Sequence, residues 1–414
     1  MTGREPIAVA LVAGTRPELI KLAPVLLELR RRPDAFRATL VVTAQHREML
    51  DQVVEAFDIR PDVDLDLMRP DQTLSELTAR VVTGVQATLA DLRPDVVLVH
   101  GDTTTCLASA LAAFYEGIPI GHVEAGLRTH DLSAPWPEEM NRRLTDPLCR
   151  WCFAPTDLAA RNLRAEGIPE DRIRVTGNTV VDALLHVLPQ VRGRQHEIPG
   201  LDTHELSGRR LVLVTGHRRE SFGEPLAQIC RALRQITARF GDVVVVYPVH
   251  PNPNVVGPVR DLLAGHDRVK LIEPLGYLPF VWLMDRAALI ITDSGGVQEE
   301  APTLGTPVLV TRLATERPEA IEHGVARLVG ASTDAIARAA SEVLERDAAD
   351  DRRPASDNPY GDGHAAGRIA EALLTASRQR GDDDGGASED RRDGDRRPEP
   401  VAGRQPRRDT QQHE

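Results

Sequence analysis

The chain has 414 residues, which favours two domains at about 100–200 residues each and excludes a single small module. Hydrophobic residues make up 41% and charged residues 27% of the chain, and no apolar run approaches the roughly 20 residues that cross a bilayer, so a transmembrane span is excluded. A formal net charge of -12 argues against general binding to nucleic acid or to an acidic membrane, because both need a positive surface field.

The first predicted strand is the apolar run at residues 7–13. This run is short and leads into Gly-Thr-Arg-Pro at residues 14–17, which is typical of a strand entering a functional loop and not of a signal peptide. We therefore expect a cytoplasmic protein.

Apolar runs alternate with helical patterns along the rest of the chain. The remaining predicted strands are residues 38–43, 96–100, 118–123, 152–154, 173–176, 210–215, 243–248, 269–272, 289–292 and 308–310. Continuous apolar runs separated by helical stretches indicate βαβ units and parallel sheets buried on both faces. The pattern predicts an α/β protein with two doubly wound domains.

Changes in composition mark the predicted boundaries. Residues 189–208 carry Pro, Gly, His and charges without a sustained period, so we expect them to connect a first domain, 1–188, to a second domain, 209–363. Residues 376–414 hold 9 Arg against 10 Asp and Glu and no aromatic residue, which predicts a disordered tail without a catalytic role.

The two predicted domains begin alike. Residues 9–18 and 211–220 each form an apolar strand followed by Gly-x-Arg-x-Glu. Ligands of doubly wound sheets bind at the carboxyl ends of the strands, so we expect these two turns to face a shared cleft.

Cysteine and lysine are both rare. Four cysteines are too few for a disulfide framework and lack zinc-site spacing, so we expect reduced packing residues at Cys106, Cys149, Cys152 and Cys230. Of 50 basic residues only Lys21 and Lys270 are lysine, which hints that Lys21 marks a place that needs a compact ammonium. Together with Arg16, Lys21 would supply positive charge to an anionic ligand such as a diphosphate in the predicted cleft.

Three acidic residues are predicted at one edge of the first sheet. Asp102 follows the strand at residues 96–100 and precedes a helix, so it is either an N-cap or a functional carboxylate. Glu124 follows the next strand, and Glu138 begins a helix four residues before Arg142. Each could be structural on its own. Gathered in one cleft, however, they would raise one another's pKa and form a proton-transfer site.

The second domain offers complementary groups. Residues 293–300 (DSGGVQEE) follow a strand with a Gly-Gly turn whose exposed N–H groups could cradle a phosphate, although many such pairs only permit tight geometry. Glu300 could accept hydrogen bonds from ribose hydroxyls, and Arg317 could pair with phosphate. His217 is either a proton donor, a phosphate ligand or a structural histidine.

Eight motifs then point to one family. They are residues 14–18 (GTRPE), 43–47 (TAQHR), 100–104 (HGDTT), 122–128 (HVEAGLR), 135–139 (PWPEE), 215–220 (TGHRRE), 293–300 (DSGGVQEE) and 315–319 (TERPE). Their conjunction and order resemble the non-hydrolysing UDP-N-acetylglucosamine 2-epimerases of bacteria, and the resemblance covers residues 5–375.

The resemblance implies a GT-B fold, in which two Rossmann-like domains hold the nucleotide sugar between them and a last helix, near residues 364–375, packs on the first domain. It implies interconversion of UDP-N-acetylglucosamine and UDP-N-acetylmannosamine, which supplies precursor for cell-surface polysaccharide, without a redox cofactor or a metal. The family is often a homodimer, and some members use a second substrate molecule as an activator, near positions that match Gln45 and His250.

The resemblance also assigns residues. The catalytic set would be Asp102, Glu124, Glu138 and His217. The substrate-binding set would be Arg16, Lys21, Phe280, Ser294, Gly295, Gly296, Glu300 and Arg317. Leu275 departs from the glutamine that some members have near the uracil, so that contact would be made by the backbone or be absent.

Several functions remain open from the sequence. A related epimerase of a UDP-2,3-diacetamido sugar, a glycosyltransferase of the GT-B fold and a noncatalytic nucleotide-sugar binder would all fit two such domains. The several acids favour epimerisation. Direct removal of the C2 proton would leave an unstabilised carbanion. Loss of UDP during deprotonation gives a neutral glycal instead, and this route needs acid-base groups on both faces of the ring.

Overall fold

The computed structural model describes residues 5–43, 53–69, 71–216, 222–313, 315–346 and 358–385. The chain divides into two units, Met1–Ala372 and Leu373–Glu414. Both sheets and all described candidate site residues belong to the first unit.

The first sheet has seven parallel strands in the order β3-β2-β1-β4-β5-β6-β7. They are β1 (Ile7–Ala13), β2 (Phe36–Val42), β3 (Val63–Asp64), β4 (Val96–His100), β5 (Ile120–Val123), β6 (Trp151–Ala154) and β7 (Ile173–Val175). The strand order reverses between β1 and β4. The loops that leave these two strands therefore lie at the switch point where doubly wound sheets bind their ligands.

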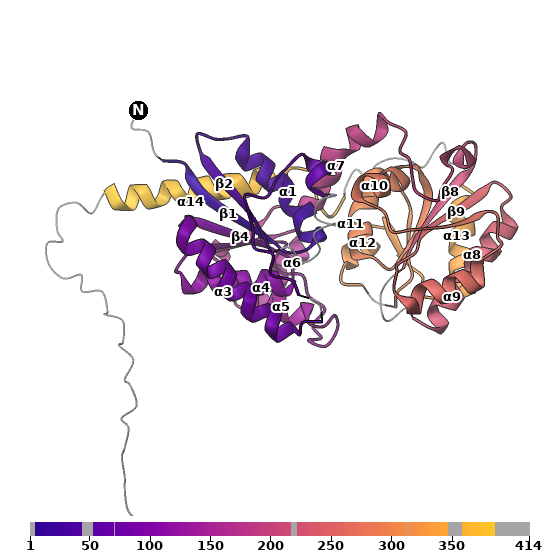
Figure 1. The fold of residues 1–414 in the computed structure, drawn as a ribbon, viewed down its shortest axis with the longest axis horizontal. Helices are drawn as coiled ribbons and strands as arrows, with labels where there is room; N and C mark the ends of the chain where they lie inside the picture. Colours follow the sequence, from indigo (N-terminus) through magenta and orange to yellow (C-terminus); the bar gives the residue numbers. More distant parts are fainter. Residues whose placement is uncertain are drawn as a thin grey trace, which may run out of the picture. The chain divides into compact units, whose positions relative to one another are not determined.

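Helices cover both faces of this sheet, with α1 against α7 and α3 against α4 (Figure 1). The helices are α1 (Arg16–Arg30), α3 (Leu74–Leu92), α4 (Thr104–Tyr115), α5 (Glu138–Thr145), α6 (Asp157–Ala165) and α7 (Thr179–Arg192), with short 3-10 turns η1 (Asp146–Leu148) and η2 (Glu170–Arg172). This two-sided cover is why the strands are continuous apolar runs and do not alternate with polar residues.

Helix α3 shows how the sequence specifies one of these layers. The side chains of Thr73 and Glu76 form a capping box at its first turn, which satisfies N–H groups that the helix leaves unpaired. Its buried residues recur every four positions at Leu77, Val81, Val85 and Leu89. They form one apolar stripe that joins the core of the first sheet.

The second sheet has six parallel strands in the order β10-β9-β8-β11-β12-β13, and its order reverses between β8 and β11. They are β8 (Arg210–Thr215), β9 (Val243–Pro248), β10 (Val269–Ile272), β11 (Ala287–Thr292), β12 (Val308–Val310) and β13 (Ala326–Leu328). The predicted fold class, two doubly wound α/β domains, is confirmed. We call the parts built on the two sheets the N-terminal lobe and the C-terminal lobe.

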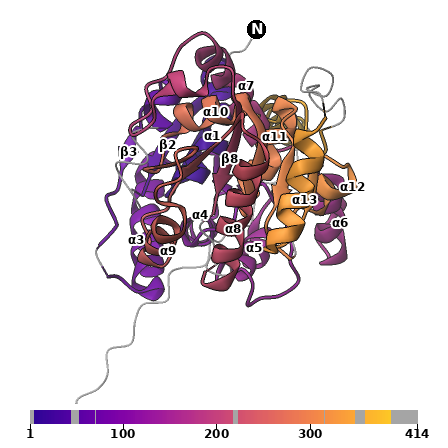
Figure 2. The same cartoon turned by 90° about the vertical axis from the view of Figure 1, so that its right-hand side faces the viewer.

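The helices of the C-terminal lobe are α8 (Glu224–Arg239), α9 (Pro253–Leu263), α10 (Tyr277–Arg286), α11 (Gly295–Leu304), α12 (Pro318–Glu322) and α13 (Thr333–Leu344). Figure 1 shows β8 and β9 between α10 and α11 on one side and α8, α9 and α13 on the other, and Figure 2 shows α13 beside α8. Helices α10 and α11 also contact α7, so the face of this lobe that carries the glycine turn meets the N-terminal lobe.

The structure extends the predicted elements at a few places. Strands β3 and β13 were not predicted, because segments of two and three residues are too short to show a pattern. The predicted connection, residues 189–208, includes the last turn of α7 and a 3-10 turn, η3 (Thr203–Leu206). The last helix, α14 (Ala365–Gly385), continues beyond the predicted end at residue 375.

The start of α14 is held by the N-terminal lobe. The carboxylate of Asp182 on α7 accepts hydrogen bonds from the backbone N–H groups of Ala365 at 3.2 Å and Ala366 at 2.9 Å. The guanidinium of Arg368 donates to the carbonyl oxygen of Thr176 at 3.0 Å. A carboxylate at a helix N-terminus satisfies unpaired N–H groups and faces the positive end of the helix dipole.

All four cysteines are buried and outside any disulfide, as predicted. Within the described part of the chain, no helix is long and apolar enough to cross a membrane. The same residues contain no group of three or more His, Cys, Asp and Glu side chains arranged to hold a metal ion.

Candidate active site

The loop after β1 is tied to the loop after β4 by Glu18. Its buried carboxylate accepts hydrogen bonds from the backbone N–H groups of Gly14 at 3.1 Å and Thr15 at 2.7 Å, and from the Thr103 hydroxyl at 2.6 Å. Burial raises the pKa of Glu18, although the hydrogen bond from Thr103 acts against it. The acid of the GTRPE motif therefore stabilises the loops and does not face a ligand.

Arg16, the first residue of α1, reaches the C-terminal lobe. Its guanidinium donates to the backbone carbonyl oxygen of Leu275 at 3.0 Å. Leu275 stands where some members of the resembled family have glutamine. Its backbone carbonyl thus accepts a hydrogen bond from a predicted nucleotide-binding arginine.

Glu124 directly follows β5 in an unusual backbone conformation, with φ of 68°. A left-handed residue other than glycine costs about 1–3 kcal/mol and persists only where the surrounding structure holds it. The side chain is held as firmly, because Lys21 and Asn178 both donate to its Oε2 atom, the latter at 2.8 Å. The Nε2 atom of His100 lies 3.7 Å from the same oxygen.

The charge state of Glu124 follows from these neighbours. Burial works to raise the pKa of Glu124, but Lys21 and then His100 outweigh it and hold that pKa well below the ordinary range. For Lys21 burial acts in the opposite direction and lowers the pKa, because the charged form is the protonated one. Its carboxylate partners, Glu124 and Glu299, outweigh burial and raise that pKa above its ordinary value. The pair is therefore an ionised carboxylate beside a protonated amine.

Lys21 has a second carboxylate partner, Glu299, which lies on α11 of the other lobe. The Lys21 Nζ atom donates to Glu299 Oε2 at 2.8 Å. Glu299 Oε1 in turn accepts from Arg317 Nε at 2.6 Å, and Arg317 Nη1 donates to Glu316 at 2.7 Å. We call Lys21, Glu124, Glu299 and Arg317 the interlobe cluster. It brings three residues predicted from the sequence together with one, Glu299, that was not predicted.

Asp102 is fixed by α5. The Arg142 guanidinium pairs with its carboxylate at 2.5 Å, and the Asn141 amide donates to its backbone carbonyl at 2.9 Å. Arg142 also lies 3.3 Å from Glu139, so its acidic partners are Asp102 and Glu139, although the sequence placed Glu138 one turn before it. Asp102 remains about one third exposed, which leaves its carboxylate accessible.

The two adjacent acids at the start of α5 have different environments. Glu139 is fully buried and accepts hydrogen bonds from the backbone N–H groups of Thr129 at 3.0 Å and His130 at 3.1 Å. Glu138 is half-buried at the first position of the helix. Of the two, Glu139 holds the preceding loop, and Glu138 is the less buried.

The predicted phosphate cradle begins α11. Ser294 is its N-cap, and Gly295 and Gly296 form its first turn, so the helix directs unpaired N–H groups and its positive dipole end away from the sheet. The Arg317 guanidinium packs directly on Gly295, because a Cβ there would lie 2.4 Å from Arg317 Nη1. The absence of a side chain at this position is therefore what admits the arginine.

The predicted ribose-binding carboxylate, Glu300, is also buried. The Tyr277 hydroxyl donates to Glu300 Oε1 at 3.0 Å. Burial raises the pKa of Glu300 to about 7, although the hydrogen bond from Tyr277 acts against it. Phe280, half-buried in the first turn of α10, lies one turn after Tyr277.

The remaining predicted site residues are less informative. His217 and Gln45 lie outside the described residues. His250 is exposed after β9, and its Nδ1 atom accepts from the Asn252 backbone N–H at 3.2 Å.

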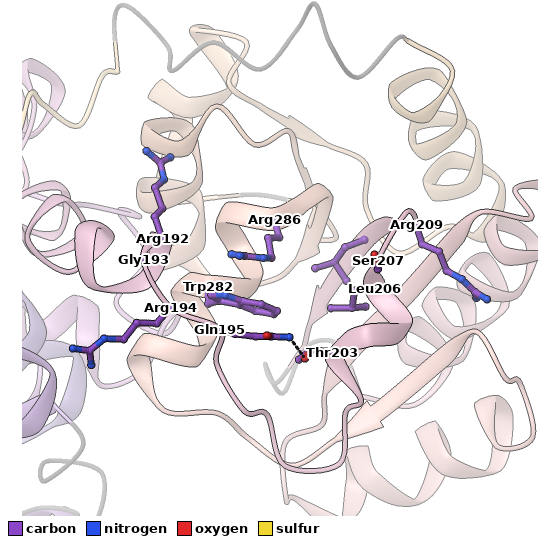
Figure 3. A pocket seen from close by; sticks show the side chains of 11 residues that line it. Arg192, Gly193, Arg194, Gln195, Thr203, Leu206, Ser207, Arg209, Trp282 and Arg286 are labelled. Atoms are coloured by element: carbon purple, nitrogen blue, oxygen red, sulfur yellow. Dashed lines mark hydrogen bonds between the residues drawn. The ribbon is translucent and has the colours of Figure 1, made fainter.

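A separate cavity of about 560 Å³ lies at the connection between the lobes and contains none of the predicted site residues. Figure 3 shows Arg286 over the ring of Trp282, 4.0 Å from the ring centre, and a hydrogen bond from Gln195 to Thr203. The side chain of Arg194 points away from Trp282 in this view (Figure 3). This cavity is distinct from the interlobe cluster.

The family model described as UDP-N-acetylglucosamine 2-epimerase matches residues 27–374. The chain belongs to this family. UDP-N-acetylglucosamine 2-epimerase from Yersinia pestis is 53% identical over 369 residues, which is 87% of this chain and 97% of that protein. The crystal structure of the Neisseria meningitidis UDP-GlcNAc 2-epimerase bound to UDP-GlcNAc is 46% identical, with a TM-score of 0.81, and covers 89% of this chain and 100% of that one.

Membership of the 2-epimerase family makes this protein an isomerase, and it confirms the family resemblance found in the motifs. Its structural neighbours include the 2-epimerase of Methanocaldococcus jannaschii in complex with UDP-GlcNAc and UDP, which is 34% identical with a TM-score of 0.75 and covers 89% of this chain and 100% of that one.

Sequence reasoning missed several residues of the site. Asn178 and His100 contact Glu124, Tyr277 holds Glu300, and Glu299 joins the lobes. Glu299 carried one signal in the sequence, its place beside Glu300 in the DSGGVQEE motif. A carboxylate next to a candidate ligand residue could have been selected on that ground, but its partners are distant in the chain.

Proposed function

We propose that this protein interconverts UDP-N-acetylglucosamine and UDP-N-acetylmannosamine by eliminating UDP to a glycal and adding it back. The observation that carries the proposal is the interlobe cluster. It joins a buried ionised carboxylate, Glu124, to the glycine turn and Arg317 of the other lobe. A base and a diphosphate site are both needed, because the C2 proton is acidic enough to remove only while UDP leaves C1.

The diphosphate would lie at the start of α11. Unpaired N–H groups of the first turn and the helix dipole favour an anion there, and Arg16 and Arg317 add positive charge. Such fixed donors stabilise the charge that develops on the leaving diphosphate. Phe280, at the start of α10, would pack on the nucleotide.

The acid-base groups would lie on the other side of the sugar. Asp102 and Glu124 follow β4 and β5, Glu138 begins α5, and His217 would complete the set. Inversion at C2 requires removal of a proton from one face of the ring and its return on the other, so more than one such group is needed. Contact between the lobes would retain the glycal and keep water from it.

Proton NMR in deuterium oxide tests the proposal. With UDP-N-acetylglucosamine as substrate, we expect the C2 proton signal to disappear while the manno epimer accumulates. Free sugar and UDP as main products would indicate a hydrolase, and transfer to an acceptor without exchange at C2 would indicate a glycosyltransferase. Either result would overturn the proposal. A strong preference for a UDP-2,3-diacetamido sugar would instead correct the substrate.

Nucleotide affinity is expected to depend on the protonation of Glu300. Its pKa of about 7 means that the carboxylate, which can accept from ribose hydroxyls, becomes protonated as the pH falls. Because binding favours the ionised form, UDP affinity is expected to fall by up to about tenfold between roughly pH 8 and pH 6, measured by calorimetry. The phosphates of UDP titrate as well, so Glu300→Gln is the control: its affinity should be lower at pH 8 and show a smaller pH dependence.

We further propose that a second copy of this chain covers an apolar surface around α5 and so forms the homodimer that the family resemblance implies. The exposed apolar side chains proposed to form this surface are Phe114 and Tyr115 at the end of α4, Leu132 and Trp136 before α5, and Met140 and Leu144 on α5. Met140 and Leu144 lie one turn apart on α5, the helix whose Arg142 holds Asp102. A partner on this face would therefore also support a catalytic residue.

Replacing both Met140 and Leu144 by glutamate is expected to yield a monomer in sedimentation experiments, because paired apolar surfaces exclude buried unpaired charges. Val175, an exposed apolar residue on β7, is the matched control, and Val175→Glu should leave the association unchanged. A wild-type monomer, or a dimer that survives the double substitution, would contradict the assignment of this surface.

Two finer expectations complete the proposal. A second UDP-N-acetylglucosamine molecule would act as an activator near His250 and Gln45, which would give a sigmoidal dependence of rate on substrate concentration. The reaction would take place in the cytoplasm.

A further inference from the structure

Glu299 is the one carboxylate in the described structure that contacts charged site residues of both lobes. Its side chain is fully buried, and each of its oxygens has its own cationic partner, Lys21 at 2.8 Å and Arg317 at 2.6 Å. Lys21 comes from α1 of the N-terminal lobe, whereas Glu299 itself and Arg317 belong to the C-terminal lobe. A buried, doubly paired carboxylate of this kind has a strong influence on both partners, because little water screens the charges.

Lys21 is shared between two carboxylates. It donates to Glu124 Oε2 and to Glu299 Oε2, and its side chain is only 7% exposed. A single buried ammonium thus divides its charge between the candidate base of one lobe and a carboxylate of the other. Neither carboxylate can move without changing the electrostatic environment of its counterpart.

Charged and polar groups surround Glu124 from five elements. Lys21 faces it from α1, His100 from the end of β4, Asn178 from the N-cap of α7 and Arg317 from the segment before α12. Glu299 on α11 shares the Lys21 donor with it. The balance among these groups decides how readily Glu124 accepts a proton.

We infer that Glu299 is a positioning residue that acts on Glu124 through Lys21. Without the Glu299 charge, Lys21 would transfer its full attraction to Glu124, which would hold the Glu124 carboxylate more tightly and make it a weaker base. Contact between α11 and α1 therefore prepares Glu124 for catalysis. The inference rests on the proposed function for the role of Glu124, but the coupling among the three side chains stands on the geometry alone.

A double-mutant cycle tests the coupling. Glu299→Gln is expected to lower kcat about 3- to 100-fold with a smaller change in UDP affinity, since coupled buried neighbours interact within that range. In a Lys21→Met background, where the intermediary is absent, the same substitution is expected to change kcat less than about twofold. An effect of equal size in both backgrounds would overturn the inference.

Glu316→Gln is the matched control. Glu316 pairs with the same Arg317 at 2.7 Å and with Arg312, so its loss perturbs the arginine that Glu299 also holds. Its effect on kcat is expected to be the same with and without Lys21. If Glu316→Gln shows the same dependence on Lys21 as Glu299→Gln, the effect travels through Arg317 and the inference is wrong.

A measurement independent of turnover covers variants that are too slow to assay. The carbon-13 carboxyl NMR signal of Glu124, assigned by its loss in Glu124→Gln, is expected to shift in Glu299→Gln and not in Glu316→Gln. The shift should vanish in the Lys21→Met background. An unmoved signal in folded Glu299→Gln would refute the coupling, whereas a wild-type enzyme that fails to epimerise would refute only the proposed function.

Discussion

Glu124→Gln is expected to lower the rate of epimerisation at least roughly a hundredfold while the protein remains folded, because a positioned acid-base group contributes on that scale. The amide keeps the shape of the side chain and can still accept from Lys21 and Asn178, but it can no longer take up a proton. The measurement is kcat from the NMR assay, together with thermal unfolding as the check on the fold.

Asp102→Asn and Glu138→Gln are expected to show losses of similar size, roughly a hundredfold or more. Glu139→Gln provides the contrast, because its buried carboxylate accepts from two backbone N–H groups and pairs with Arg142. We expect its main effect on the unfolding temperature. Near-normal turnover in all three catalytic variants would remove the argument from carboxylates.

Gly295→Ala is expected to weaken UDP binding about tenfold to a hundredfold, which corresponds to ~1–3 kcal/mol of overpacking strain. The added Cβ would lie 2.4 Å from Arg317 Nη1, so the guanidinium must move from the glycine turn and away from Glu299. Calorimetry with UDP measures the loss.

Gly296→Ala is the comparison for this effect. A Cβ at Gly296 would have Glu300 Oε2 as its nearest neighbour, at 3.9 Å, which is ordinary contact. The substitution should therefore weaken UDP binding much less than Gly295→Ala. Equal losses in the two variants would show that the displacement of Arg317 is not the cause.

Local patterns in the sequence predicted most of the fold. Strands such as Ile7–Ala13 and Val96–His100 are continuous apolar runs, and the alternating helices made their parallel pairing predictable. The motifs placed Asp102 and Glu124 immediately after strands, where doubly wound sheets bind ligands, and both positions were correct. These features are local, so a single sequence is enough to read them.

The roles of individual acids were harder to predict. Glu18, Glu139 and Glu300 all stand in motifs. Glu18 and Glu139 accept hydrogen bonds from backbone N–H groups of neighbouring loops, whereas Glu300 accepts from the Tyr277 hydroxyl. Nothing in their spacing distinguishes a carboxylate that stabilises a loop from one that faces a ligand. Burial and hydrogen-bond partners make that distinction.

The sequence by itself determined the two-lobed architecture, the family and the edge of each sheet at which the chemistry gathers. Only the tertiary structure decided which charges meet: Lys21 pairs with Glu124 and Glu299, which are 103 and 278 residues away in the chain. The physical reason is that hydrophobic periodicity and turn chemistry depend on neighbours in the chain. An ion pair depends instead on how separate strands, helices and lobes pack, and no local pattern records that.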